Sequence, residues 1–251
     1  MIAAVDGCRA GWLVARAAAW PPGSMPTVQV CRAFQDVLVV TADCAAVVVD
    51  IPIGLFGETS PCERDSGSAG APAEQRTWGK AGPRECDRLA RQRLGAAASR
   101  VFNPLPRPLL CCTNYTECNR LHRERYGRGI SRQSFGIRAK LLDVDRLMTP
   151  ALQERVREFH PELVWQRLNG GQPLPSKRRN EGLGRRIGLL RAAIPNLETL
   201  IQHPPPGAKP DDVLDALVGL ELACRITQNR AERLPECPCR DTRGLRMEIW
   251  F

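Results

Sequence analysis

The sequence is poor in features that mark several classes of protein. Aromatic residues make up only 5% of its 251 residues, which argues against an aromatic stacking platform for single-stranded nucleic acid. Its longest apolar stretches are interrupted by Asp36, Asp43 and Asp50 before they reach the ~18 residues of a membrane-spanning helix. The N-terminal stretch carries Asp6 and Arg9 and lacks the basic leading region of a signal peptide. We therefore expect a cytoplasmic protein with no membrane partner.

Zinc motifs and nucleotide motifs are also missing. The 11 cysteines do not form paired C-x₂-C units, and the chain has just three histidines, which disfavours a structural zinc site. An odd number of cysteines without an export signal argues against a complete disulfide framework, so we expect free thiols. A glycine-rich phosphate loop of the G-x-x-x-x-G-K-[ST] type does not occur, which disfavours nucleotide hydrolysis.

Positive charge is what the sequence has in excess. The formal net charge is +9, with 36 basic and 27 acidic residues. Such a balance suits a polyanionic partner, because Lys and Arg bind phosphates and release counterions. Only four of the basic residues are lysines and arginine accounts for the other 32, a bias that a GC-rich coding sequence would also produce. Both explanations stay open.

The beginning of the chain has the pattern of an α/β domain. Strands are expected over residues 2–6 and 12–18, joined as a hairpin, and over 27–32, where apolar and polar residues alternate. Residues 34–44 have helical spacing. The β-branched run at 45–51 is typical of a strand covered on both faces. With 43% hydrophobic residues, the chain can form one domain over residues 1–251.

The middle of the chain, residues 57–150, is predicted to be an inserted loop and helical layer. Residues 57–83 are rich in Gly, Ser, Ala and Pro and are expected to form a flexible surface segment. Helices are expected over 84–98, 113–126 and 131–148. Later elements are a strand over 156–160, helices over 163–168, 182–194 and 211–228, the last of them amphipathic, and a strand over 244–251.

Two carboxylates stand at the ends of predicted strands. Asp6 closes the first strand and Asp50 closes the buried one. A buried unpaired charge costs several kcal/mol, so such a residue is usually paired or bound to a metal. If the two strands are parallel neighbours, their ends lie roughly 4.8 Å apart, and the carboxylates repel each other unless a cation lies between them.

Further carboxylates open the last predicted helix. Asp212 and Asp215 are three residues apart and therefore face the same way. Together with Asp6 and Asp50 they match the oxygen ligands that Mg²⁺ or Mn²⁺ prefers. Two such ions about 3.5 to 4 Å apart can hydrolyse a phosphodiester. The alternative is that Asp211 and Asp212 cap the helix and that the strand-end acids occupy turns.

Seven separated segments resemble, in order, the motifs of an uncharacterised family of predicted nucleases with an RNase H-like fold. The resemblance spans nearly the whole chain and implies a mixed five-stranded sheet in the order 3-2-1-4-5. The second strand is then antiparallel and the helical insertion lies between the fourth and fifth strands, which makes the strands of Asp6 and Asp50 neighbours. The segments are Val5–Trp12, Asp50–Leu55, Cys86–Arg91, Ser131–Phe135, His160–Glu162, Asp211–Ala216 and Gly244–Trp250.

Within the wider superfamily the chain is most similar to Holliday-junction resolvases, whose last helix also begins with paired acids. This resemblance supports Asp212 and Asp215 as metal ligands. Glu162 is a further candidate acid, or else it caps the next helix. His160 is either a proton shuttle or structural. Ala10 replaces the glycine that is usual in the first turn of the family.

Basic residues at helical spacing and in clusters are candidates for contact with phosphates, although solvated helix faces have the same pattern. The residues predicted to bind substrate are Arg84, Arg91, Lys140, Lys177 and Arg186.

We therefore expect a Mg²⁺- or Mn²⁺-dependent nuclease that acts on DNA or RNA. Its metal ligands are predicted to be Asp6, Asp50, Asp212 and Asp215, with Glu162 as a further catalytic acid. Two alternatives stay open, because a fold does not determine a function. One is a non-catalytic binding protein on the same scaffold, and the other is an enzyme that acts on a small phosphorylated ligand.

Overall fold

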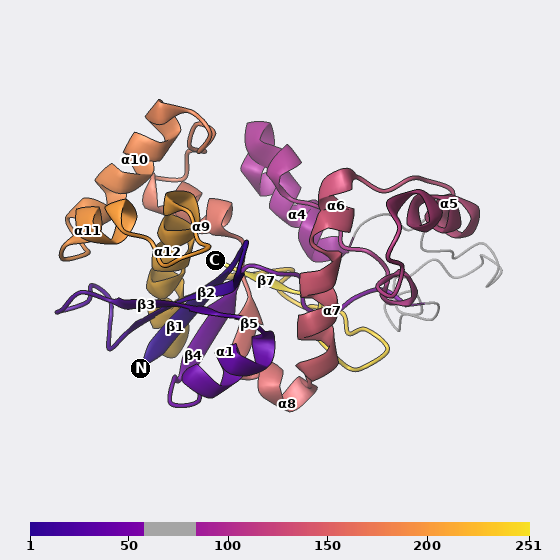
Figure 1. Ribbon diagram of the computed structural model, residues 1–251, viewed down its shortest axis with the longest axis horizontal. Coiled ribbons are helices and arrows are strands. Elements are labelled where there is room, and N and C mark those ends of the chain that lie inside the picture. Colours follow the sequence, from indigo (N-terminus) through magenta and orange to yellow (C-terminus); the bar gives the residue numbers. More distant parts are fainter. Residues whose placement is uncertain (58–83) are drawn as a thin grey trace.

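The computed structural model describes residues 1–57 and 84–251. Its centre is a mixed five-stranded sheet in the order β3-β2-β1-β4-β5 (Figure 1). β2 is antiparallel to β1 and β3, whereas β1, β4 and β5 are parallel. The expected α/β class, strand order and strand directions are confirmed. The strands are β1 (Ile2–Cys8), β2 (Gly11–Ala17), β3 (Thr27–Cys31), β4 (Ala46–Val49) and β5 (Val156–Glu158).

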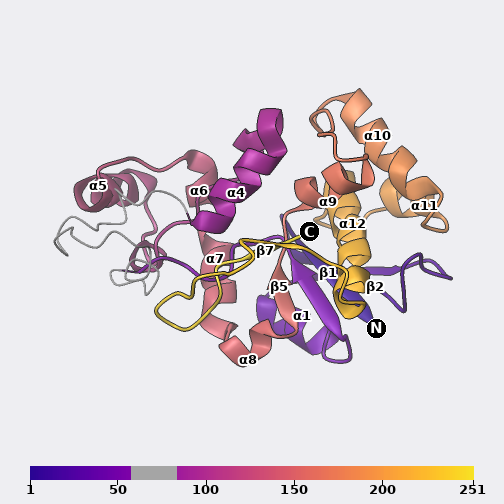
Figure 2. The same ribbon diagram turned by 180° about the vertical axis from the view of Figure 1, so that it is seen from behind.

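Helices cover both faces of this sheet. Helix α1 (Phe34–Val40) packs against β2 and β3 on one face, and α12 (Pro210–Thr227) packs against β1, β2 and β4 on the other (Figures 1 and 2). Every residue of β4 is buried, as expected for a β-branched strand between two helical layers.

Close contact between α12 and β1 depends on a glycine. A Cβ atom at Gly219 would lie 2.6 Å from the Cβ of Ala4 and 2.9 Å from the ring of Phe159. Asp215 lies one helical turn before Gly219, and Asp6 lies two residues after Ala4 on the same face of its strand. The contact at Gly219 therefore directs Asp215 toward Asp6.

The segment between β4 and β5 is largely helical, and two of its elements differ from expectation. The helix expected over 84–98 ends earlier, because Gly95 adopts a φ of 53° and the chain continues as a 3-10 helix. The helix expected over 131–148 is divided at Ile137, directly after Gly136. The elements are α4 (Glu85–Leu94), η2 (Gly95–Arg100), η3 (Arg107–Leu109), α5 (Tyr115–Tyr126), α6 (Arg132–Gly136), α7 (Arg138–Leu147) and α8 (Pro150–Gln153).

After β5, three helices pack around α12. Residues Val213 to Ile226 of α12 are all buried, so the expected amphipathic character of this helix is wrong; α9, α10 and α11 cover its outer side. The tail forms a shorter strand than expected. The elements are α9 (Pro161–Leu168), α10 (Asn180–Arg191), α11 (Leu197–Gln202), β6 (Arg233–Leu234) and β7 (Ile249–Trp250).

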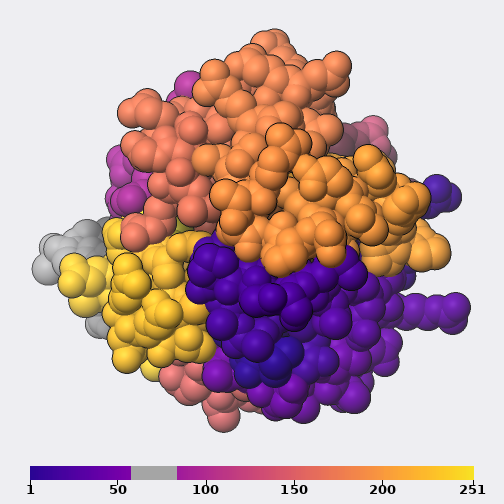
Figure 3. Space-filling view, turned by 90° about the vertical axis from the view of Figure 1, so that its left-hand side faces the viewer, coloured from indigo at the N-terminus to yellow at the C-terminus, as the bar shows by residue number. Residues whose placement is uncertain are grey.

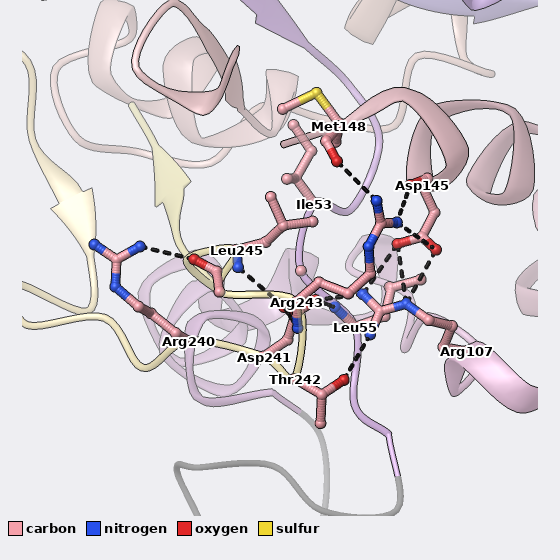
Figure 4. A network of polar contacts seen from close by, with 12 residues as sticks. Ile53, Leu55, Arg107, Asp145, Met148, Arg240, Asp241, Thr242, Arg243 and Leu245 are labelled. Carbon is pink, nitrogen blue, oxygen red and sulfur yellow. Dashed lines mark hydrogen bonds and ion pairs between the residues drawn. The ribbon is translucent and has the colours of Figure 1, made fainter. Parts of the chain in front are cut away.

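The C-terminal segment returns to the N-terminal part of the molecule, so that the two lie side by side in the space-filling view (Figure 3). A polar network holds it there (Figure 4). The Asp241 carboxylate accepts from the backbone N–H groups of Leu55 and Leu245, each at 3.0 Å, and pairs with Arg107. Arg107 also pairs with Asp145 at 3.0 Å. The network thereby fixes the chain that follows Asp50.

Two expectations concern the chain as a whole. Within the described residues, none of the helices combines the length and apolar character needed to cross a membrane. Nine cysteines of these residues carry free thiols, as expected, whereas Cys239 is disulfide-bonded, which corrects the expectation for that residue. The flexible segment predicted over 57–83 lies, from residue 58 onward, outside the described residues.

Candidate functional site

A cleft of about 680 Å³ lies at the carboxyl ends of β1 and β4. Three of the four carboxylates predicted to bind metal line it, namely Asp6, Asp50 and Asp215. They come from β1, from the residue after β4, and from the start of α12. Cationic and histidine side chains that line the same cleft are Arg100, Lys140, His160, Lys177 and Arg178.

The sheet brings Asp6 and Asp50 together. Val5 of β1 and Val49 of β4 are partners in the parallel register, and the N–H of Asp50 donates to the carbonyl of Val5 at 2.9 Å. Asp6 follows Val5 and Asp50 follows Val49, and residues that face each other across two parallel strands project on the same side of a sheet. The juxtaposition expected from the strand order is therefore present.

Asp215 reaches the cleft from α12 and has two side-chain partners. Its Oδ1 accepts from the indole N–H of Trp165 at 2.8 Å, and its Oδ2 accepts from Lys177 Nζ at 2.6 Å. Lys177 also contacts Asp211 at 3.3 Å. Asp215 is 4% exposed, so this ammonium group is its principal counter-charge.

The carboxylates of the cleft disfavour one another's ionisation. Burial raises the pKa of Asp6 well above its ordinary value, and the charges of Asp50 and Asp215 raise it further. Burial also raises the pKa of Asp50, from 3.8 to about 6, with His160 opposing the shift and Asp215 adding to it. Lys177 lowers both values. The site is therefore short of positive charge.

Asp212 has a different position. Its carboxylate accepts from the backbone N–H of Lys209 at 2.9 Å and so caps α12. Burial raises its pKa, and the Lys209 hydrogen bond opposes that shift. Asp212 does not line the cleft. Capping, the alternative considered from the sequence, is what the structure shows for this residue.

The donor set fits a divalent cation in its chemistry and only partly in its spacing. Buried carboxylates that repel one another are typical ligands for Mg²⁺ or Mn²⁺. Among the described residues, however, no three His, Cys, Asp or Glu side chains lie close enough to hold a metal ion. The ammonium group of Lys177 stands against Asp215 instead. Metal binding would therefore require the side chains of Lys177 and Asp215 to move apart.

Glu162 and His160 line the cleft but are engaged elsewhere. The Glu162 carboxylate pairs with Arg186 at 2.8 Å and with Arg100 at 2.6 Å. His160 Nδ1 accepts from the backbone N–H of Glu162 at 3.3 Å, and its Nε2 lies 3.2 Å from the carbonyl oxygen of Arg100. The structure thus gives His160 the role of capping α9 and gives Glu162 two guanidinium partners.

Two of the residues predicted to bind substrate are buried, which corrects that expectation. Arg84 is 0% exposed and pairs with Asp87 at 2.7 Å and with Glu158 at 2.6 Å. Arg186 is likewise 0% exposed and pairs with Glu162. Neither guanidinium can reach a substrate, because carboxylates inside the protein hold both of them.

The other three predicted residues lie at cavities. Lys140 lines the cleft, donates to the carbonyl of Gly11, and lies 4.7 Å from the ring centre of Trp12. Lys177 lines the cleft beside Asp215. Arg91 lines a separate, smaller cavity. All three therefore line a space that a ligand could enter.

Sequence reasoning missed Trp165 and Arg100. Trp165 is fully buried in α9 and holds Asp215 through its indole N–H, and Arg100 reaches Glu162 from the 3-10 helix η2. Neither belongs to a segment with a recognised motif. Only the packing of α9 against α12 brings Trp165 to the acid.

The comparisons with known proteins give one match. The model of a family described as "Protein of unknown function (DUF429)" matches residues 5–240, which is nearly the whole chain. The search of curated proteins and the search of solved structures gave no match.

Proposed function

We propose that this chain, which belongs to the DUF429 family of proteins of unknown function, is a divalent-metal-dependent nuclease with an RNase H-like fold. The proposed reaction is hydrolysis of phosphodiester bonds in DNA or RNA at the acidic cleft. The proposed cofactor is Mg²⁺ or Mn²⁺.

One observation carries the proposal. Asp6, Asp50 and Asp215 come from two strands and a helix and meet in one cleft, where their charges oppose one another. A fold maintains such an arrangement at a cost in stability, because carboxylates that are removed from water and repel one another are unfavourable. Perturbed carboxylates that gather in a cleft are characteristic of functional sites.

The architecture supports the assignment to the RNase H-like class. The strand order β3-β2-β1-β4-β5, with β2 antiparallel, is the order that the resemblance of the sequence motifs implies. The acids also lie on or beside the expected elements: Asp6 is in the second half of β1, Asp50 directly follows β4, and Asp215 is in the first half of the last helix.

Asp6, Asp50 and Asp215 would hold the metal once Lys177 leaves Asp215. When bound, Mg²⁺ or Mn²⁺ supplies activation of the attacking water and stabilisation of the charge on the leaving oxygen. Lys140 and Arg178 line the cleft around the acids and can contact the non-bridging oxygens of a phosphodiester. Lys177, released from Asp215, is placed to do the same.

An assay of nucleic-acid cleavage tests the proposal. We expect the wild-type protein to cut at least one member of a panel of DNA and RNA duplexes, flaps, junctions and single strands in Mg²⁺ or Mn²⁺. Asp50→Asn should reduce the rate on the order of 100-fold or more, because a charge that stabilises the transition state is lost. The control is Asp43→Asn, since Asp43 lies before β4, is 57% exposed and pairs with Arg16; its rate should be unchanged.

The outcome also discriminates between the alternatives. An uncut panel in the presence of bound metal would reject the nuclease. Hydrolysis of small phosphate esters under the same conditions would then support an enzyme acting on a small phosphorylated ligand. Retention of nucleic acid without cleavage would support a binding protein. Equal rates for wild type and Asp50→Asn would show that cleavage does not occur at this cleft.

A further inference from the structure

A second cavity adjoins the acidic cleft. Its volume is about 260 Å³, and Val101 and Phe102 line both spaces. Phe102 is 39% exposed although it is a large apolar side chain. The chain at residues 101–102 is thus a shared wall between the cleft and the second cavity.

The two spaces have opposite charge. Carboxylates of Asp6, Asp50 and Asp215 line the cleft. Among the described residues that line the second cavity there is no Asp or Glu, whereas two guanidinium groups, those of Arg91 and Arg128, line it. Hydroxyl and amide groups come from Asn103, Ser131 and Ser134. The second cavity is therefore rich in hydrogen-bond donors.

Arg91 has neutral partners. Its guanidinium donates to the carbonyl of Val101 at 3.0 Å and to the side-chain oxygen of Asn103 at 2.5 Å. Within residues 1–57 and 84–251 it makes no ion pair. These bonds orient the guanidinium in the wall of the cavity while leaving its charge without a carboxylate, so that an anion would be attracted to it.

The electrostatics of the second cavity are the reverse of those in the cleft. Burial lowers the pKa of Arg128, and the charge of Arg91 lowers it further. The two guanidinium groups therefore repel each other across a partly desolvated space. An anion in this cavity would be attracted by both charges.

Two of the sequence motifs supply residues to both spaces. On α4, Asp87 lines the cleft and Arg91 lines the second cavity, four residues apart on one face of the helix. At α6, Gln133 lines the cleft, whereas Ser131 and Ser134 line the second cavity. The spacing of these motifs thus couples the two spaces.

We propose that the second cavity is a phosphate-binding subsite for a nucleotide, with Arg91 and Arg128 as its anion ligands and Phe102 as a stacking surface for the base. Guanidinium groups match phosphate geometry, and an exposed aromatic ring accepts any base. The nucleotide could be part of the nucleic-acid strand held in the cleft, and this step rests on the proposed nuclease function. Binding of the phosphate itself is independent of that function.

Calorimetric titration of the full chain with a nucleoside monophosphate tests the proposal. We expect saturable binding by the wild type without added metal, and binding that is about tenfold or more weaker for Arg91→Gln, because a charged hydrogen bond is lost. Arg88→Gln is the matched control, since Arg88 lies on the same helix, is 46% exposed and pairs with Glu85; its affinity should equal that of the wild type. Inorganic phosphate should bind more weakly than the nucleotide because it cannot stack on Phe102.

Additional variants keep the test decisive. Arg91 also supports residues 101–103, so Arg128→Gln should give the same loss if Arg91→Gln unfolds by circular dichroism. Asp6→Asn should keep nucleotide binding even if it abolishes Mn²⁺ binding, which separates this subsite from the proposed nuclease site. Wild-type affinity in both arginine variants, equal loss in Arg88→Gln, or loss in Asp6→Asn would overturn the proposal.

Discussion

The interior of the molecule contains two clusters of charged side chains that differ in how their oxygens are satisfied. In one, Arg84 donates to both oxygens of Asp87 and both oxygens of Glu158. In the other, Asp6 accepts from the N–H of its neighbour Gly7, and within the described residues no donor contacts the carboxylate of Asp50. The carboxylates of Asp87 and Glu158 are thus held by Arg84, whereas those of Asp6 and Asp50 have no cationic partner within the described residues.

The two clusters also differ in whether they hold parts of the fold together. A carboxylate held by a guanidinium and a backbone N–H is structural, and Glu158 accepts from Ile53 N–H at 2.6 Å as well. The Arg84 cluster thus joins α4 to β5 and to the chain after β4. Asp6 and Asp50 have no ion-pair partner among the described residues, and Lys177 offsets their cost of desolvation only in part.

The largest effect is expected from removing Arg84 from its cluster with Asp87 and Glu158. Arg84→Met should lower the free energy of unfolding by about 3 to 5 kcal/mol, because it leaves two buried carboxylates without their partner. Urea denaturation followed by circular dichroism measures this. Arg88→Met, which removes an exposed pair with Glu85, should cost about 0 to 1 kcal/mol. Similar losses in the two variants would show that the buried cluster has no special structural role.

In the cleft, by contrast, we expect a substitution to raise the free energy of unfolding. Asp50→Asn should raise the free energy of unfolding of the metal-free protein at neutral pH by about 1 to 2 kcal/mol, because it removes a charge whose ionisation the fold disfavours. Asp50 is partly exposed, which keeps this gain modest. Denaturation of wild type and variant in a chelator measures the difference. A loss of stability would mean that the Asp50 charge is compensated in the folded protein.

The pH dependence should follow from the same residue. The pKa of Asp50 is raised from 3.8 to about 6 by burial, so the folded protein holds this proton more tightly than the unfolded chain. The tighter proton binding at Asp50 stabilises the folded protein fully below the ordinary pKa of 3.8, and this stabilisation is lost as the pH rises through about 6. The metal-free wild type should therefore lose stability across this interval relative to Asp50→Asn. Parallel pH profiles for the two proteins would contradict the assignment.

The smallest effect concerns the counter-charge in the cleft. Lys177→Met should tighten Mn²⁺ binding by roughly tenfold, because the ammonium group that competes for Asp215 is removed. Calorimetry at constant ionic strength measures this. Arg185→Met removes the same charge from an exposed pair with Glu181 and should leave the affinity unchanged. Weaker Mn²⁺ binding in Lys177→Met would show that the lysine supports the metal instead of competing with it.

The sequence was most informative where a pattern is tied to backbone geometry. The continuous apolar run before Asp50 predicted a strand buried on both faces, and the family resemblance predicted that this strand lies beside β1. Once two parallel strands are neighbours, their final carboxylates must approach each other. This is why the pairing of Asp6 with Asp50 could be foreseen.

The sequence was least informative about the surroundings of charged side chains. Arg84 directly precedes α4 and Arg91 lies within it, yet the first is buried between two carboxylates and the second lines a cavity. Asp212 and Asp215 are three residues apart, yet one caps α12 and the other enters the cleft. Helical spacing specifies a face, whereas partners that are distant in the sequence, such as Lys177 for Asp215, decide what that face contacts.

A crystal of the protein soaked in Mn²⁺ would show whether the cleft binds a metal, since manganese is located by its anomalous scattering. We expect an anomalous peak in direct contact with the carboxylates of Asp6 and Asp50, with Lys177 displaced from Asp215. Soaked crystals of Asp50→Asn should lack this peak. An empty cleft at saturating Mn²⁺, or a peak at another set of residues, would contradict the proposal that Asp6, Asp50 and Asp215 form a metal site.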